Sequence, residues 1–338
     1  MATLHFLNVK QGDCSIIRHN SGNITVIDVC NAGPEQRLVE ALKTQSAKAE
    51  KGVSGNFNQK KYPVNPVAYL RKLDITSIFR FIATHPDMDH VDGIKYLFEQ
   101  FNPLNFWDTD NNAEKDFPEG SAFNEEDWKF YKKLRDGNPG TDPKRLTLYA
   151  GASGKYFNVA QDGSSGGDGL YVLAPTKTLV SDANDCDDHN DCSYVILYRT
   201  NRYRIVFGGD SHDKTWGHIL KNHKSDVENI DLLIAPHHGR DSDRDYSFLD
   251  ILKPKMTFFG NANSEHLAYD KWNSRKLPFI TNNQAGSMIV DAGYDDALRI
   301  YVTHEQFAKK VNPNTFYSTD LDAYYYVAVS AKPKQPAA

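Results

Sequence analysis

The sequence predicts an α/β protein with a four-layer αββα architecture, in which two β-sheets lie between layers of helices. Strand-like and helix-like segments are interspersed in both halves of the 338-residue chain, and no strong linker divides them. Hydrophobic residues make up 40% of the chain and charged residues 25%, as in ordinary globular proteins with a sizeable core. We therefore expect one domain over residues 1–326, with a lid-like insertion at about 102–151 and a disordered tail over 327–338.

The first hundred residues predict strands and helices in turn. Runs rich in β-branched residues between turn residues are typical of strands, and apolar residues at helical spacing are typical of helices. The expected elements are strands over 4–9, 14–19 and 23–29, a helix over 34–52, a mobile loop over 53–62, a helix over 67–73, a buried strand over 77–84 and a helix over 91–101.

The segment 102–151 has weaker periodicity and is rich in Asp, Asn, Gly and Pro. One helix is expected there, over 125–137. Long connections tend to be functional, so we expect an insertion or lid. Its aromatic residues Trp107, Trp128 and Tyr131 are candidates for stacking on nucleic-acid bases, although packing in the core is the more frequent use of such side chains.

The remaining chain predicts a second series of strands with helices between them. The expected elements are strands over 169–175, 193–200 and 203–207, a helix over 214–223, a strand over 230–236, a helix over 246–253, and strands over 256–261, 278–282, 287–292 and 298–303.

Three polar motifs each follow a strand of this prediction. THPDMDH begins at Thr84, GGDSHD at Gly208 and PHHGRDSD at Pro236. A lone HH pair or GD turn is more often structural than functional. Three such motifs at strand ends together indicate a functional site, because ligands in layered α/β folds bind at the carboxyl ends of strands.

These motifs predict a pair of divalent cations. Carboxylates and imidazoles crowded beside buried strands suffer desolvation and mutual repulsion, which cations relieve. We expect His85 and Asp87 to bind one ion, Asp89 and His90 a second, and Asp210 to bridge them, with either His237 or His238 completing the second site. The oxygen-rich ligand set favours Mn²⁺ or Mg²⁺, and Zn²⁺ remains open.

The order and context of these motifs resemble the metallo-β-lactamase fold superfamily. Within that superfamily, the sequence resembles the soluble hydrolase domain of the DNA-uptake channel protein ComEC and its free-standing relatives. The similarity covers roughly Leu4 to Val302 and rests on LNVKQGDCSII with VIDV, HPDMDH, NDCSYVILY, IVFGGD, APHHGR, SEHLAYDKW and ITNNQAG.

The sequence departs from the superfamily pattern at three points. Asp87 stands where the superfamily usually has a second His, and Lys10 stands where Gly is common. The usual third His has no clear counterpart, and His189, Asn190 and Asp191 remain candidates for its place. ComEC itself carries membrane helices, whereas the longest apolar runs here are far too short to cross a bilayer.

The motifs predict a metal-dependent hydrolase in which a hydroxide bridging two ions attacks the substrate. Asp89 would orient the water or accept its proton, and His237, His238 or His266 would protonate the leaving group. Ser193, Ser211 and His266 are candidate substrate-binding residues.

The resemblance implies a phosphodiesterase or nuclease acting on DNA or another phosphodiester. The formal net charge of −5 and the absence of a broad basic groove weigh against a large nucleic-acid surface. Hydrolysis of a lactone, β-lactam or thioester is an alternative, and a degenerate binding module without turnover is another.

The compartment is predicted from the cysteines and the N-terminus. The four cysteines form no CxxC pair, and the N-terminal residues do not read as a signal peptide, so we expect a cytoplasmic protein without membrane contact. The oligomeric state is left open.

Overall fold

A computed structural model describes residues 1–34, 57–137, 142–262, 266–294 and 296–330. The predicted helix over 34–52 lies almost entirely outside the described residues, as do residues 53–56 of the predicted loop over 53–62. Within that loop, η1 (Gln59–Lys61) forms a single helical turn.

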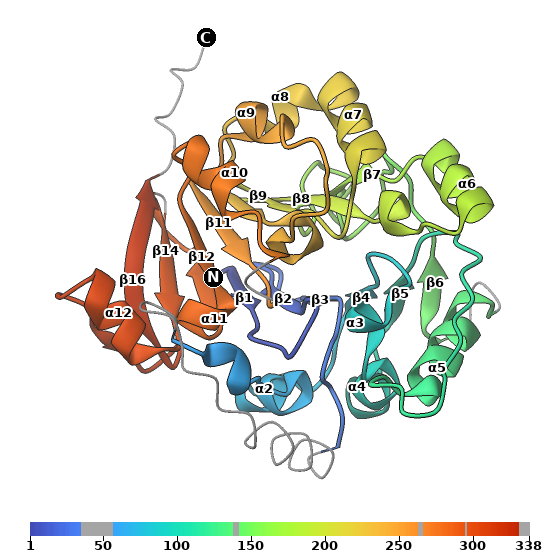
Figure 1. Ribbon diagram of the computed structural model, residues 1–338, viewed down its shortest axis with the longest axis horizontal. Coiled ribbons are helices and arrows are strands. Elements are labelled where there is room, and N and C mark those ends of the chain that lie inside the picture. The colour runs from blue at the N-terminus through green and yellow to red at the C-terminus, as the bar shows by residue number, and fades with distance from the viewer. Residues whose placement is uncertain (35–56, 138–141, 263–265, 295, 331–338) are drawn as a thin grey trace.

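Within the described residues the first sheet contains ten strands, in which strands from the C-terminal end of the chain join those from the N-terminal half where β13 pairs with β1 (Figure 1). In order across the sheet they are β15 (Tyr317–Ser318), β16 (Ala323–Ser330), β14 (Ala297–Val302), β13 (Met288–Asp291), β1 (Thr3–Phe6), β2 (Ser15–Arg18), β3 (Ile24–Ile27), β4 (Arg80–Ile82), β5 (Asn105–Trp107) and β6 (Lys144–Leu146). Pairing is antiparallel from β15 to β3 and parallel from β3 to β6.

The second sheet contains six strands from the C-terminal half of the chain. In order they are β12 (Phe279–Thr281), β11 (Met256–Phe259), β10 (Leu232–Ile234), β9 (Tyr203–Phe207), β8 (Val195–Thr200) and β7 (Leu170–Ala174). The strands β12 to β9 are parallel, and β9, β8 and β7 are antiparallel.

Side-chain alternation along the strands divides the core into layers. On β4, Ile82 faces the second sheet and packs in one cluster with Phe207 and Ile234, whereas its neighbour Phe81 packs against the helices on the opposite face. On β9, Val206 likewise faces outward. The two sheets therefore pack face to face, and each has an outer apolar face that helices cover.

The helices follow this division, as Figure 1 shows. The first sheet is covered by α2 (Pro66–Lys72), α4 (Ile94–Phe101) and α5 (Glu125–Arg135), and the second by α7 (Asp213–Asn222), α9 (Phe248–Leu252) and α10 (Tyr269–Ser274). The other helices are α3 (Met88–Val91), α6 (Lys177–Cys186), α8 (Lys224–Val227), α11 (Asn282–Ala285), α12 (Glu305–Val311) and the single turns η2 (Asn190–Cys192) and η3 (Pro236–Gly239). The predicted αββα arrangement is confirmed.

The segment 102–151 differs from the predicted lid. It contributes β5 and β6 to the edge of the first sheet, and α5 packs on that sheet. Trp107, Trp128 and Tyr131 are at most 2% exposed, so they are core residues and not surfaces for stacking on bases. Three-residue edge strands carry too little periodicity to be recognised in a segment rich in turn residues.

The C-terminal region also differs from prediction. Residues 327–330, expected in the tail, belong to β16, and the remaining residues 331–338 lie outside the described part of the chain. Pairing of β16 with β14 outweighs the Pro- and Lys-rich composition immediately beyond it. The helices α6 and α12 were not predicted either. Within the described residues, no helix is long and apolar enough to cross a membrane.

A buried ion pair joins β4 to the segment that precedes β7. The guanidinium of Arg80 lies 3.0 Å from the carboxylate of Asp168, and both side chains are 2% exposed. Asp168 also accepts hydrogen bonds from Ser21 and Asn23 in the turn between β2 and β3. Removing one partner of such a pair leaves the other charge buried without compensation.

We therefore expect Asp168→Ala to lower the free energy of unfolding by about 3–5 kcal/mol, measured by urea denaturation. Asp162→Ala is the matched control, because Asp162 lies in the same segment, is exposed and accepts hydrogen bonds from Ser164. The control should cost less than about 1 kcal/mol. Equal losses for the two variants would contradict the assignment.

Candidate metal centre

The three polar motifs converge at one end of the two sheets. His85 lies in the loop after β4, and Asp89 and His90 lie on the short helix α3 that follows it. The loop after β9 carries Asp210, and η3 after β10 carries His238. The strands β3 and β4 are parallel in one sheet, and β9 and β10 are parallel in the other, so their carboxyl ends present these loops toward a common point.

Asp210 lies at the centre of this group. Its Oδ1 lies 3.3 Å from Nε2 of His90, and its Oδ2 lies 3.8 Å from Nε2 of His85 and 3.7 Å from Nε2 of His238. The other carboxylate, Asp89, reaches Nε2 of His238 at 3.3 Å and Nε2 of His90 at 3.9 Å. Two sets of ligand atoms are compact enough for one ion each: His85, His90 and Asp210, and Asp89, His90 and His238.

Buried carboxylates fix the far side of two imidazole rings. Nδ1 of His90 lies 2.8 Å from Oδ2 of Asp28, and Nδ1 of His238 lies 2.9 Å from Oδ1 of Asp13. Asp28 is itself held by the backbone N–H and the hydroxyl of Thr84, each at 2.7 Å. When a carboxylate accepts a hydrogen bond from Nδ1–H, the lone pair of Nε2 is free to bind a metal ion. This is the usual arrangement behind a metal-binding His.

The inner atoms of the cluster lack hydrogen bonds. Nε2 of His85, His90 and His238 and Oδ1 of Asp210 are buried and have no hydrogen-bond partner among the described residues. Although Asp210 lies within ion-pair distance of these rings, the geometry is not that of hydrogen bonds. Buried polar atoms without partners are costly, and a cation bound at a compact ligand set would supply partners that the described residues do not. The donor set therefore fits a divalent metal ion.

The charges within the cluster raise the pKa of two of its imidazoles and lower the pKa of its carboxylates. Burial opposes the charged forms of His90 and His238, but nearby carboxylates, Asp210 above all, raise the pKa of both rings well above the usual value. Burial likewise opposes ionisation of Asp210, yet the charges of the surrounding imidazoles hold its pKa well below the usual range. The pKa of Asp89 falls to about 2, against the effect of burial, chiefly through the imidazole of His238, 3.3 Å away. The cluster thus favours added positive charge.

The turn η3 separates the two adjacent histidines. His237 and His238 both have left-handed backbone angles, with φ of 52° and 57°, a conformation that costs about 1–2 kcal/mol for a side chain other than Gly. This turn directs His238 into the cluster. His237 lies outside both compact ligand sets, with Nε2 3.6 Å from Asp210 and with Nδ1 accepting a 3.0 Å hydrogen bond from Arg244. The geometry therefore favours His238 as the ligand.

Gly12 allows the first loop to approach the site closely. Its φ is +71°, and a Cβ at this position would meet the backbone oxygen of Asp89 at 1.8 Å. Any other residue would push the loop away from α3. The close approach brings the neighbouring Asp13 against His238.

Asp87, the predicted ligand of the first ion, lies outside both compact sets among the described residues. Its Oδ2 is 3.4 Å from Nε2 of His85, and its Oδ1 forms a 2.6 Å ion pair with Lys115. His189, one of the candidates for the third His, is buried, and its Nε2 has no hydrogen-bond partner in the described structure. Burial lowers the pKa of His189, and the charges of Lys115 and His85 lower it further, whereas the carboxylates of Asp187 and Asp87 act in the opposite direction.

Two of the three predicted substrate-binding residues are serines whose hydroxyls form hydrogen bonds inside the protein. Ser193 is fully buried and its hydroxyl accepts a hydrogen bond from the backbone N–H of Asp210, while Ser211 is fully buried and donates to the carbonyl oxygen of Gly208. Both side chains therefore support the loop that carries Asp210. His266 is exposed, and its backbone oxygen accepts a hydrogen bond from Asp241.

Four further residues of the site were missed. Asp13 and Asp28 lie in motifs that carry the family resemblance, but no role was predicted for them. Lys115 and Arg244 follow no recognisable pattern, and only the fold brings them to Asp87 and His237.

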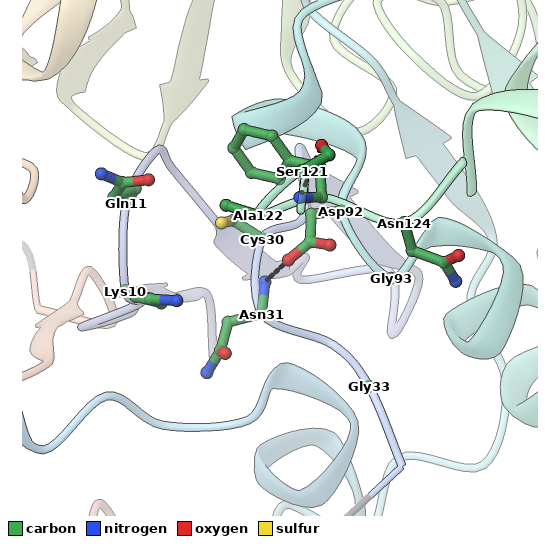
Figure 2. A pocket seen from close by; sticks show the side chains of 11 residues that line it. Lys10, Gln11, Cys30, Asn31, Gly33, Asp92, Gly93, Ser121, Ala122 and Asn124 are labelled. Carbon is green, nitrogen blue, oxygen red and sulfur yellow. Dashed lines mark hydrogen bonds between the residues drawn. The ribbon is translucent and has the colours of Figure 1, made fainter. Parts of the chain in front are cut away.

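A separate cavity of about 370 Å³ lies beside the C-terminal end of α3 (Figure 2). Lys10, Gln11, Cys30 and Asp92 are among the residues that line it, and the carboxylate of Asp92 accepts a hydrogen bond from the backbone N–H of Asn31. None of the cluster residues lines this cavity, so it provides no evidence on the substrate of the metal centre.

No protein-family model matches the chain, and no curated protein matches it significantly. Among solved structures it is similar to Igni18, described as a novel metallo hydrolase from the hyperthermophilic archaeon Ignicoccus hospitalis KIN4/I, with 9% identity and a TM-score of 0.46 over 86% of this chain and 98% of that chain. A diphosphatase from the PhnP family has 13% identity and a TM-score of 0.40, over 83% and 94% of the two chains.

A mutant of the CmlA beta-hydroxylase has 9% identity and a TM-score of 0.40 over 76% of this chain. The chain spans only 45% of the length of that protein. Similarities at these identities and TM-scores identify no function for this chain.

The raised pKa values predict a pH dependence for metal binding. Protons on His90 and His238 compete with a cation for Nε2, and in the metal-free protein both rings stay protonated to a pH well above the ordinary pKa of histidine. Affinity for Mn²⁺ should therefore rise as pH increases from about 6 to 8, by up to about tenfold per pH unit for each proton displaced. Calorimetry in buffers of different ionisation enthalpy measures the protons released. Affinity that is constant over this range, without proton release, would contradict the assignment.

Asp13 tests the support behind the cluster without removing a ligand. Asp13→Asn removes the charge that holds Nδ1 of His238, so affinity for Mn²⁺ should fall about 10–100-fold while the fold is retained. The control is Asp250→Asn, because Asp250 is an exposed residue of α9 that pairs with Arg275. This variant should leave the affinity for Mn²⁺ unchanged. A metal titration measures both affinities, and equal affinities of the two variants for Mn²⁺ would contradict the role of Asp13.

Proposed function

We propose that the protein is a metal-dependent hydrolase that acts on phosphodiesters. The observation that carries the proposal is the set of buried, unbonded ligand atoms on His85, His90, His238 and Asp210, backed by the carboxylates of Asp13 and Asp28. A structural role alone would not leave so many polar atoms without partners in the core.

A bound divalent cation supplies two effects, since it makes a coordinated water more acidic and polarises the attacked group. In this proposal Asp89, His90, Asp210 and His238 hold the cation. Asp89, whose side chain is 30% exposed, is the carboxylate of the cluster with access to solvent, and it accepts the proton of the attacking water. Asp210 is buried and keeps its charge, which suits a ligand and not a proton carrier.

His237 is the proposed donor to the leaving group. Burial lowers its pKa to about 4, so the ring is neutral at neutral pH. Arg244 donates to Nδ1, which places the ring proton on Nε2, beside Asp210. A neutral imidazole in this position donates a hydrogen bond to the departing oxygen.

Two features favour a phosphodiester over a carbonyl substrate. The carboxylate oxygens of Asp89 and Asp210 suit harder cations such as Mn²⁺ and Mg²⁺, which are common partners of phosphates. The partly exposed ammonium of Lys115 and the buried guanidinium of Arg244 lie beside Asp87 and His237 and add positive charge around the cluster, which favours an anionic substrate. The resemblance to ComEC-type hydrolase domains points to the same class, with DNA as one candidate.

Asp210→Asn tests the proposal. Loss of the central charge should lower the rate of bis(p-nitrophenyl) phosphate or single-stranded DNA hydrolysis with Mn²⁺ by more than about a hundredfold. The control is Asp250→Asn, which should retain full activity. Unchanged turnover of the Asp210 variant with metal added back would refute the proposed centre.

A substrate panel separates the proposed activity from its alternatives. The proposal predicts phosphodiester cleavage across Mn²⁺, Mg²⁺ or Zn²⁺ and none of nitrocefin, lactones or thioesters. Cleavage of those carbonyl substrates alone would instead assign the carbonyl hydrolase alternative, and metal binding without any turnover would favour a binding module.

A further inference from the structure

Lys115 places a fixed positive charge beside the predicted site of the first ion. It lies in the connection between β5 and α5, and its ammonium group is 2.6 Å from Oδ1 of Asp87. The same ammonium lies 5.9 Å from the ring centre of Trp128, a buried residue of α5. The side chain is 28% exposed, so the pair is partly shielded from water. The carboxylate and the aromatic face thus hold the ammonium from two sides.

This ion pair explains why Asp87 does not join the cluster. Each of its oxygens already has a partner, since Oδ1 pairs with Lys115 and Oδ2 lies 3.4 Å from Nε2 of His85. Of the described residues, the compact ligand sets include Asp210 and Asp89 but not Asp87. The two compact ligand sets share Nε2 of His90, because Nδ1 of that ring is held by Asp28, so only one ion at a time can use this ring fully. A second dication beside Asp87 would also lie next to an ammonium of like charge, so the residues do not fit a second cation while Lys115 is present.

We propose that the ammonium of Lys115 takes the place of the second cation, so that each chain binds one divalent ion, held by Asp89, His90, Asp210 and His238. The inference rests on the proposed function and corrects the expectation of two ions. In this arrangement Lys115 supplies the second positive charge of the centre, and the segment 102–151 acts by delivering that lysine.

The residues around Lys115 predict what its removal would do. Without the ammonium, Asp87 becomes available beside His85, 3.4 Å from its Nε2. Together with Oδ2 of Asp210, 3.8 Å from the same Nε2, these side chains supply imidazole and carboxylate ligands for another ion. Removal of the lysine charge should therefore create a second metal site.

Metal content per folded chain tests the proposal directly. The full-length protein and its variants are dialysed against Mn²⁺, and bound metal is counted by mass spectrometry after circular dichroism confirms the fold. We expect one ion in the wild type and two in Lys115→Met, which keeps the stem beside Trp128 but removes the charge. Lys115→Arg, which retains a cation, should bind one ion.

Lys132→Met is the matched control. Lys132 forms an ion pair of the same 2.6 Å length with Glu114, the residue next to Lys115 in the chain, and neither partner belongs to the compact ligand sets. This variant should bind one ion, as the wild type does. A second ion in the control would assign the effect to general charge and overturn the role of Lys115.

The possible outcomes are distinguishable. Two ions in the wild type, or one ion in a folded Lys115→Met variant, would overturn the inference while leaving the proposed function intact. No bound ion in any protein would instead refute the proposed function itself. If Lys115→Met does not fold, the electron paramagnetic resonance spectrum of the Mn²⁺-loaded wild type decides, since isolated ions support the inference and a spin-coupled pair overturns it.

Discussion

The buried carboxylate of Asp210 is the constraint on which the rest of the site depends. It lies at the end of β9 with almost no exposure, surrounded by the rings of His85, His90 and His238. A charge in this position is costly unless positive charge surrounds it closely. The loops from both sheets meet around this carboxylate. The packing of the two sheets and the chemistry of the centre therefore both require positive charge close to Asp210.

The N-terminal strands complete the centre from behind. Asp13 precedes β2 and Asp28 follows β3, and each carboxylate orients one imidazole whose chain position is far away. Asp13 and His238 are separated by 225 residues. These two carboxylates explain how the rings of His90 and His238 keep Nε2 directed into the cluster although Nε2 itself has no hydrogen bond.

Sequence reasoning recovered the parts of this arrangement that depend on local pattern. Buried strands followed by His and Asp are visible in HPDMDH, GGD and PHHG, because each motif lies next to the strand that places it. The layered architecture followed from the same strands. The remaining features depend on contacts between distant segments. Sequence spacing could not choose between His237 and His238, because the choice depends on the left-handed turn of η3. The hydroxyls of Ser193 and Ser211 were assigned to substrate because their burial cannot be read from the chain. Lys115 lies in a segment of weak periodicity, and only the packing of α5 against the first sheet brings its ammonium to Asp87.

Anomalous diffraction from crystals grown with Mn²⁺ tests the central claim most directly. The account predicts a strong peak within about 2.0–2.3 Å of Nε2 of His90 and His238 and of the Asp210 and Asp89 carboxylates. A map without a peak among these residues, or with the ion bound only elsewhere on the chain, would contradict it.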